Sequence, residues 1–122
     1  MTTTEPNPMT ARERLPDRRP AETLDIEPGG LRYRATIGRF NDGRLAEIFL
    51  TNHKAGSTAG IMASDSAVLC SIALQHGVPV ETLRRALMRD SAGRAIGPLG
   101  VVLDLVEPQD HAVNTAGEAQ PG

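Results

Sequence analysis

The stretch from Leu31 to Thr51, LRYRATIGRFNDGRLAEIFLT, decides the fold of this chain. Between Leu31 and Ile37 apolar residues alternate with polar ones, and this period of two predicts a half-buried antiparallel strand. Asp42-Gly43 follows as a hairpin signal, because glycine tolerates the positive φ that tight hairpin turns demand. Residues 45–51, LAEIFLT, are rich enough in apolar and β-prone side chains to form the returning strand.

The sequence on either side adds one strand and two or three helices. Upstream, TLDIE and then PGG at residues 28–30 predict a shorter strand and a turn, which completes a three-stranded meander. Downstream, residues 58–76 are apolar almost all round a helix, with Ser64, Asp65, Ser66 and Ser71 as the polar positions, so we expect this helix to be largely buried across the sheet. Residues 79–89, PVETLRRALMR, predict a second helix. VVLDLV at residues 101–106 fits a helix or a strand, and we favour a helix. The expected fold class is α+β.

The two ends of the chain differ in composition from the middle. Residues 1–20 contain four prolines and little apolar surface, which predicts a flexible arm. Residues 21–106 form the predicted domain, and residues 107–122 are a small, polar, unpatterned tail that we expect to be disordered. Within the arm, RERLPDRRP could dock onto a partner, whereas a solvated basic stretch is the plainer interpretation. The docking candidates are Arg12, Arg14, Leu15, Arg18 and Arg19.

Charge and composition exclude several classes of partner. The net charge is −2, and the chain holds two Phe, one Tyr and no Trp. It therefore offers neither a basic footprint for a nucleic-acid backbone nor aromatic platforms for bases. We find no signal-peptide core and no run near the ~20 apolar residues of a spanning helix. We expect a cytoplasmic protein that binds neither nucleic acid nor membrane.

No catalytic set is visible in the sequence. Cys70 is the single cysteine, which excludes an intramolecular disulfide, and its place among Leu69, Ile72 and Ala73 predicts a buried, inert thiol. His76 precedes Gly77 at the end of the long helix, where a structural role is sufficient explanation. No histidine pair has the spacing of a helical metal site. We predict no catalytic residue and no metal site.

The connection NHKAGSTAG, residues 52–60, is the best candidate site. If Ser57 or Thr58 caps the following helix, the N–H groups of its first turn and the helix dipole favour an anion. His53 and Lys54 could add donors and charge, and Gly56 would supply a strained φ. The alternative is a plain strand-to-helix turn with a capping serine. The anion-binding or nucleotide-binding candidates are His53, Lys54, Gly56, Ser57 and Thr58.

Several pieces in order, RERLPDRR, GRFNDGRLAEIFL, NHKAGS, SAVLCSIALQHGVPVETLRRAL and GPLG, resemble the TSCPD domain. In that family the domain occurs at the C-terminal end of adenosylcobalamin-dependent (class II) ribonucleotide reductases and as small stand-alone bacterial proteins. The resemblance covers residues 12–106. One departure is clear: where the family has its Thr-Ser-Cys-Pro-Asp signature, this chain reads LMRDSAGRAIGPLG and has no cysteine.

The resemblance implies an accessory domain connected with ribonucleoside-diphosphate reductase and deoxyribonucleotide synthesis. Such a domain would bind a reductase, a nucleotide phosphate, or both. Nothing here corresponds to the reductase barrel or its cysteines, so we expect no independent activity. Adenosylcobalamin would belong to the full-length reductase, and we expect this chain to bind no cofactor. The alternative function is a stand-alone interaction module that docks through its Arg-rich arm or its sheet edge.

Overall fold

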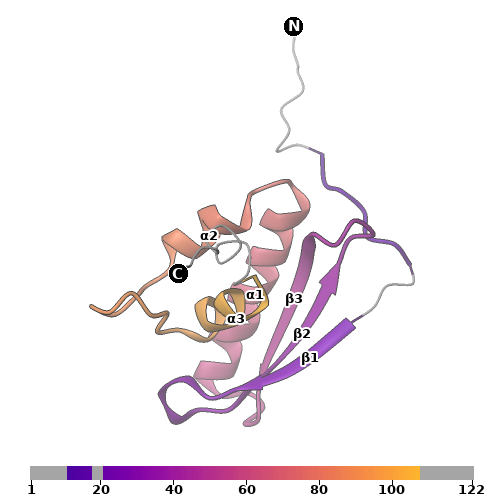
Figure 1. Cartoon of the computed structure of the whole chain (residues 1–122). Helices are drawn as coiled ribbons and strands as arrows, with labels where there is room; N and C mark the ends of the chain where they lie inside the picture. The colour runs from indigo at the N-terminus through magenta and orange to yellow at the C-terminus, as the bar shows by residue number, and fades with distance from the viewer. Residues whose placement is uncertain (1–10, 18–20, 108–122) are drawn as a thin grey trace, which may run out of the picture.

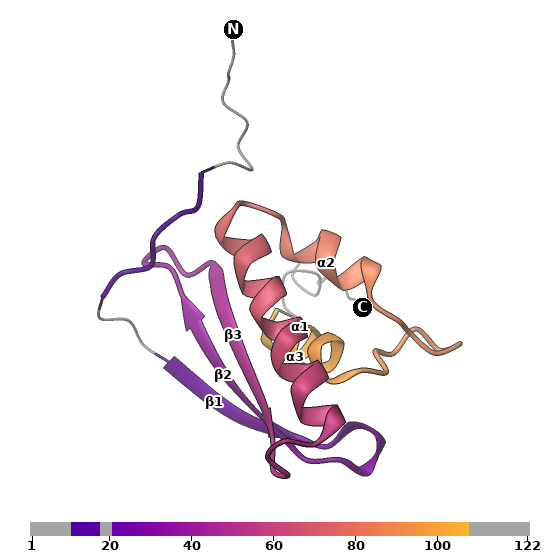
Figure 2. The same ribbon diagram turned by 180° about the vertical axis from the view of Figure 1, so that it is seen from behind.

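A three-stranded antiparallel sheet with three helices on one face forms the fold (Figures 1 and 2). The computed structural model describes residues 11–17 and 21–107. The strands lie in the order β1-β2-β3, with a short 3-10 turn at Pro28–Gly30 between the first two. This arrangement confirms the predicted α+β class. The elements are β1 (Ala21–Ile26), β2 (Tyr33–Arg39), β3 (Leu45–Asn52), α1 (Thr58–Gln75), α2 (Val80–Ala86) and α3 (Pro98–Val106).

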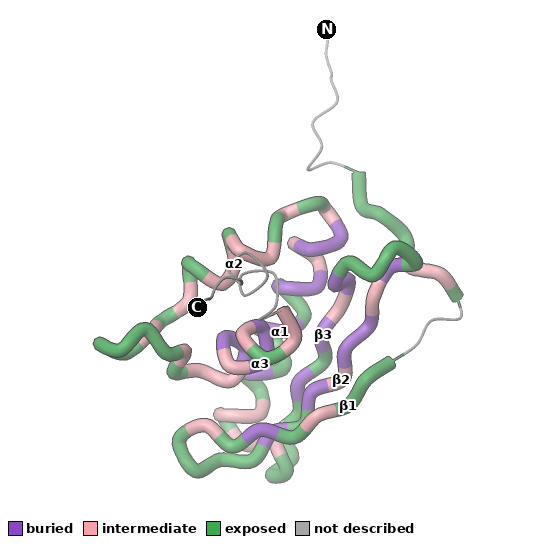
Figure 3. The backbone as a smooth tube through the Cα atoms, viewed as in Figure 1, coloured by how far each residue is buried: buried purple, intermediate pink, exposed green. Residues whose placement is uncertain are grey.

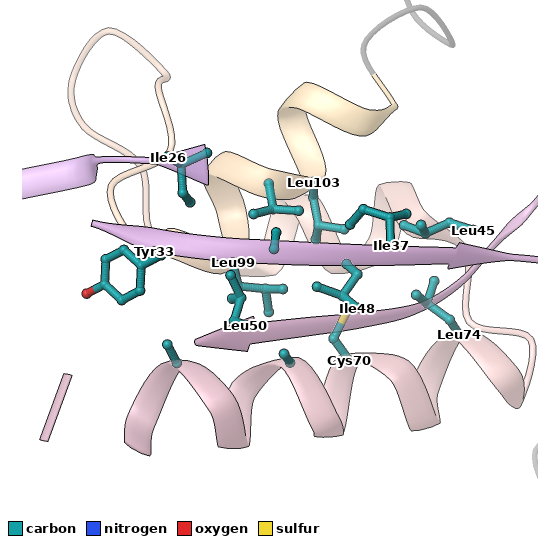
Figure 4. Packing of buried hydrophobic residues seen from close by; sticks show 14 residues of the cluster. Ile26, Tyr33, Ile37, Leu45, Ile48, Leu50, Cys70, Leu74, Leu99 and Leu103 are labelled. Carbon is teal, nitrogen blue, oxygen red and sulfur yellow. The ribbon is translucent and has the colours of Figure 1, made fainter. Parts of the chain in front are cut away.

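The register of the sheet separates a core face from an open face. Ile37 lies opposite Ile48, and both side chains are buried beneath the helices (Figure 4). Thr36 lies opposite Phe49 on the other face, where the Phe49 ring is half exposed. The hairpin closes at Gly43 with φ 93°, which is the positive φ that the Asp-Gly signal predicts.

Side chains of α1 cover the outer edge of β3. The Ser71 hydroxyl accepts a hydrogen bond from the Ile48 N–H (2.8 Å) and lies 3.1 Å from the Ile48 carbonyl oxygen. One turn later, the Gln75 amide donates to the Ala46 carbonyl (3.0 Å). An unpaired strand edge is a template for unwanted pairing, and here helix side chains take the place of a fourth strand. The helix therefore runs beside β3, as Figure 4 shows.

The outer face of α1 is exposed, so the expectation of a largely buried helix is wrong. Six of its 18 residues are buried, because only the side toward β3 meets the sheet (Figure 3). By length and composition alone α1 could cross a membrane, contrary to the expectation that no run approaches that length, but a core helix passes the same test. The exposed apolar side chains, here called the α1 outer face, are Ile61 (53% exposed), Met62 (65%), Val68 (46%) and Leu69 (68%).

The predicted second helix is too long by about one turn. α2 ends at Ala86, and Leu87 is already extended, because the chain turns into a small hairpin in which Arg89 bridges to Ala95. Asp104 of α3 fixes this turn by accepting hydrogen bonds from Arg89 (2.8 and 2.9 Å) and from Arg84 of α2 (2.9 Å). The region VVLDLV lies in α3, which confirms the helical alternative.

Residues 11–17, which the sequence assigns to the arm, lie against the domain. The Arg12 guanidinium donates to the Gln75 side-chain oxygen (2.6 Å), and the Glu13 N–H donates to the Gln75 carbonyl (2.7 Å). The Glu13 carboxylate also pairs with Arg44 of the hairpin (2.9 Å). Gln75 thus joins three separate segments of the chain. Arg18, Arg19 and the tail from residue 108 lie outside the described residues.

Candidate functional site

The loop between β3 and α1 is organised by the Asn52 side chain. Its amide nitrogen donates to the Arg32 carbonyl (2.9 Å), and its oxygen accepts from the Lys54 N–H (2.9 Å) and the Ser57 hydroxyl (3.3 Å). Ser57 in turn caps α1 by accepting from the Gly60 N–H (3.1 Å). The predicted cap is therefore Ser57, and Thr58 is the first residue of the helix. Sequence reasoning missed Asn52, although an Asx residue at a strand end is a recognised turn signal.

Gly56 has the strained backbone that the sequence predicts. Its φ is 78°, in the left-handed region that disfavours a Cβ atom. A Cβ built there would meet nothing within 4 Å, so the constraint comes from the backbone alone. Gly56 thus serves the turn, and no side chain crowds it.

The predicted anion-binding residues divide between two surface hollows. Lys54 and Gly56 line a shallow hollow of about 350 Å³ beside the first turns of α1, together with Ser64 and Asp65. His53 lines a different hollow of about 300 Å³ at the end of the sheet. The loop therefore does not gather all five residues around one ligand.

The hollow beside α1 has mixed electrostatics. The N-terminal end of α1 and the Lys54 ammonium favour an anion there. The Asp65 carboxylate opposes one, and the Ser57 hydroxyl is already used in the cap. The geometry thus fits the turn-and-cap alternative closely and leaves Lys54 as the one basic side chain on this hollow.

Cys70 and His76 have structural positions. Cys70 is buried and faces Ile48 in Figure 4, and burial raises the pKa of its thiol to about 11. The burial of Cys70 is as predicted, and a thiol with so high a pKa is not an activated nucleophile. His76 is the C-cap of α1 and is followed by Gly77 with φ 92°. Within the described residues, no group of three or more His, Cys, Asp or Glu is placed to hold a metal ion.

The docking candidates of the arm are partly engaged within the chain. The Arg12 guanidinium bonds to Gln75, as described above. Arg14 and Leu15 line a hollow of about 290 Å³ together with Phe40 of the hairpin. Arg14 and Leu15 are therefore placed beside a hollow, and Arg12 is bonded to α1.

The family model of the TSCPD domain matches residues 9–104 of this chain. The chain belongs to the TSCPD family. Its similar relatives include the vitamin B12-dependent ribonucleotide reductases of Agrobacterium fabrum (41% identical over 70 residues) and Bradyrhizobium diazoefficiens (38% over 73 residues). The reductase of Rhodopirellula baltica is 40% identical over 72 residues.

These matches cover a small part of each relative. They span 57–60% of this TSCPD chain but only 6–7% of each of the three reductases. No solved structure matches the chain. The segment LMRDSAGRAIGPLG, which has no cysteine, holds the Asp90–Arg94 turn. There the Asp90 carboxylate accepts from the N–H groups of Ala92 and Arg94 (2.9 Å each).

Proposed function

We propose that this TSCPD chain is an accessory domain that associates with a vitamin B12-dependent ribonucleotide reductase and is not catalytic alone. The observation that carries the proposal is the match of 57–60% of this chain to 6–7% of each of several such reductases. Reduction by thiols needs a redox pair, and this chain has one cysteine, which is buried. Its contribution to deoxyribonucleotide synthesis is then binding.

The α1 outer face is the surface that fits this association best. It places two pairs of apolar side chains about two turns apart on one helix, with the carboxylate of Asp65 on the turn between them. Exposed apolar patches on small proteins mark interaction sites. The occupant that we propose is the surface of the reductase polypeptide.

The test measures binding of the chain to a B12-dependent reductase that lacks this domain, by calorimetry. Leu69→Ser removes the most exposed member of the α1 outer face and touches no buried contact. Loss of an interface anchor costs about 2 kcal/mol or more, so we expect at least about thirtyfold weaker binding. Met88→Ser is the matched control, because Met88 is 78% exposed and lies after α2. Equal binding of wild type and Leu69→Ser would contradict the proposed surface, and no binding at all would contradict the proposed function.

A nucleotide phosphate at Lys54 is the second candidate, favoured by the position of Lys54 beside the first turns of α1. Lys54 is the only lysine of the chain, so ¹³C-methylation of amines labels it and the N-terminus alone. Titration with ADP should shift the Lys54 signal. Lys54→Ala should weaken binding while changing the free energy of unfolding by less than ~0.5 kcal/mol, as surface substitutions usually do. Equal ADP affinity of Lys54→Ala and wild type would leave this candidate without support.

A further inference from the structure

One corner of the open sheet face gathers basic and hydroxyl side chains from two strands. Arg34 of β2 lies directly opposite Thr51 of β3. One step further along, the His53 N–H donates to the Arg32 carbonyl (3.3 Å), which places His53 opposite Arg32. Residues two apart on a strand share a face, so all four side chains lie on the same side of the sheet. They line the hollow of about 300 Å³ together with Asp25 and Tyr33.

The charges of this corner are not balanced. Arg34 donates to both oxygens of Asp25, at 2.9 and 3.4 Å, and this pairing lowers the pKa of Asp25. A guanidinium has five N–H donors, so three remain for another acceptor. No carboxylate is bonded to the Arg32 guanidinium in the described part of the chain. Two arginines against one aspartate leave a net charge of +1, before any contribution of His53.

We propose that this corner binds the phosphate group of a nucleoside diphosphate or of free phosphate. Arg32, the free donors of Arg34, the imidazole of His53 and the hydroxyl of Thr51 would donate to it from different sides. A tetrahedral oxyanion offers acceptors in several directions and suits this arrangement better than a planar carboxylate does. The corner adjoins the hollow at Lys54, since Thr51 lines both, but Lys54 does not line the corner, and binding there does not depend on association with a reductase.

The experiment uses ¹⁵N-labelled full-length chain and NMR titrations with inorganic phosphate, ADP and adenosine. Phosphate and ADP should both shift the resonances of Arg32, Thr51 and His53, whereas adenosine should not. Stronger binding of ADP than of phosphate would assign the site to a nucleotide. Equal binding of the two would assign it to the phosphate group alone. Arg32→Ala should weaken binding about tenfold, as loss of a charge-assisted hydrogen bond does.

The matched control is Arg85→Ala, which removes one exposed arginine of α2 on the opposite side of the sheet. It should leave phosphate affinity within about twofold of wild type, since exposed charges contribute little at a distance. Arg32→Gln is a second variant that removes the charge and keeps a long polar side chain. Its ¹⁵N spectrum, compared with that of wild type, shows whether the sheet remains intact. Absence of shifts at Arg32 and His53, equal shifts with adenosine, or equal losses in Arg32→Ala and Arg85→Ala would overturn the proposal. None of these outcomes bears on binding of a reductase to the α1 outer face.

Discussion

At the scale of single residues, Ser71 is a position whose role could not be predicted from the sequence. The helical pattern identifies it as a polar position of α1, and an isolated serine in a helix is expected to face water. In the structure it is buried, and its hydroxyl accepts a hydrogen bond from Ile48 of β3, which is 23 positions earlier in the chain. Because α1 is apolar almost all round, its periodicity does not show which side meets the sheet. The partner of Ser71 could not be predicted without the tertiary structure.

Ser71→Ala should destabilise the fold strongly for so small a change. It leaves the buried N–H of Ile48 without its acceptor, and an unsatisfied buried polar group costs about 1–3 kcal/mol. Urea unfolding of wild type and variant measures the difference. Ser64→Ala, on the exposed side of the same helix, is the control and should change stability by less than ~0.5 kcal/mol. Equal midpoints for the two variants would contradict the bridging role.

Gly56 allows a second test at this scale, because its environment is open and only its backbone is strained. Gly56→Ala should cost roughly 1–2 kcal/mol, the penalty of a left-handed L-residue. Gly56→Asn should cost less, since asparagine tolerates this conformation. Thermal unfolding compares the two variants. The opposite order would show that contacts, and not φ, determine the choice of glycine at this position.

At the scale of elements, local signals were predicted well and long-range ones were not. The β2-β3 hairpin and the Ser57 cap depend on residues within five positions, and both are confirmed. The end of α2 depends on Asp104, which is 15 positions beyond Arg89 and draws that arginine out of the helical path. Helical periodicity alone therefore extended α2 to residue 89.

The ion pairs that Asp104 of α3 makes with Arg84 and Arg89 should make part of the protein's stability sensitive to acid. Hydrogen bonds from Arg89 and then from Arg84 lower the pKa of Asp104 in the folded state. The stability that ionised Asp104 adds to the fold is fully present above the pKa of an aspartate in the unfolded chain, near 4. It is lost as the pH falls from that value through the lower pKa of Asp104 in the folded state. Asp104→Asn should therefore cost roughly 1 kcal/mol at pH 7 and little at the acid end. Unfolding free energies measured from pH 7 down to pH 2.5 would test this, and a constant difference would contradict it.

At the scale of the whole molecule, Gln75 ties the segment 11–17 to α1 and β3. Removing residues 1–17 takes away the Arg12 and Glu13 donors and should lower the free energy of unfolding by roughly 1–2 kcal/mol. Removing residues 1–10 keeps both donors and is the control. Urea unfolding of the two truncated chains gives the comparison. Equal stabilities would show that the segment adds nothing to the fold.

The candidate sites differ in the same way: residues that are close in sequence could be grouped in advance, and residues brought together by strand pairing could not. The loop residues Lys54, Gly56 and Ser57 are neighbours in sequence, so their grouping was predictable. The corner of Arg32 and His53 arises from strand register, which joins residues 21 positions apart. Register follows from turn type and from the bulge between Gly38 and Arg39, and the sequence does not show that bulge directly.

The cover that α1 places over β3 limits how copies of this protein can aggregate. Within the described chain, the sheet has two edges. At the edge of β3, Ser71 and Gln75 of α1 form hydrogen bonds to the strand, whereas the edge of β1 has no strand beside it. Fibril growth needs two open edges on every molecule, so that each added copy offers a new template. With one edge open, pairing of β1 with β1 stops at two copies, and continuous cross-β growth would first require α1 to detach from β3.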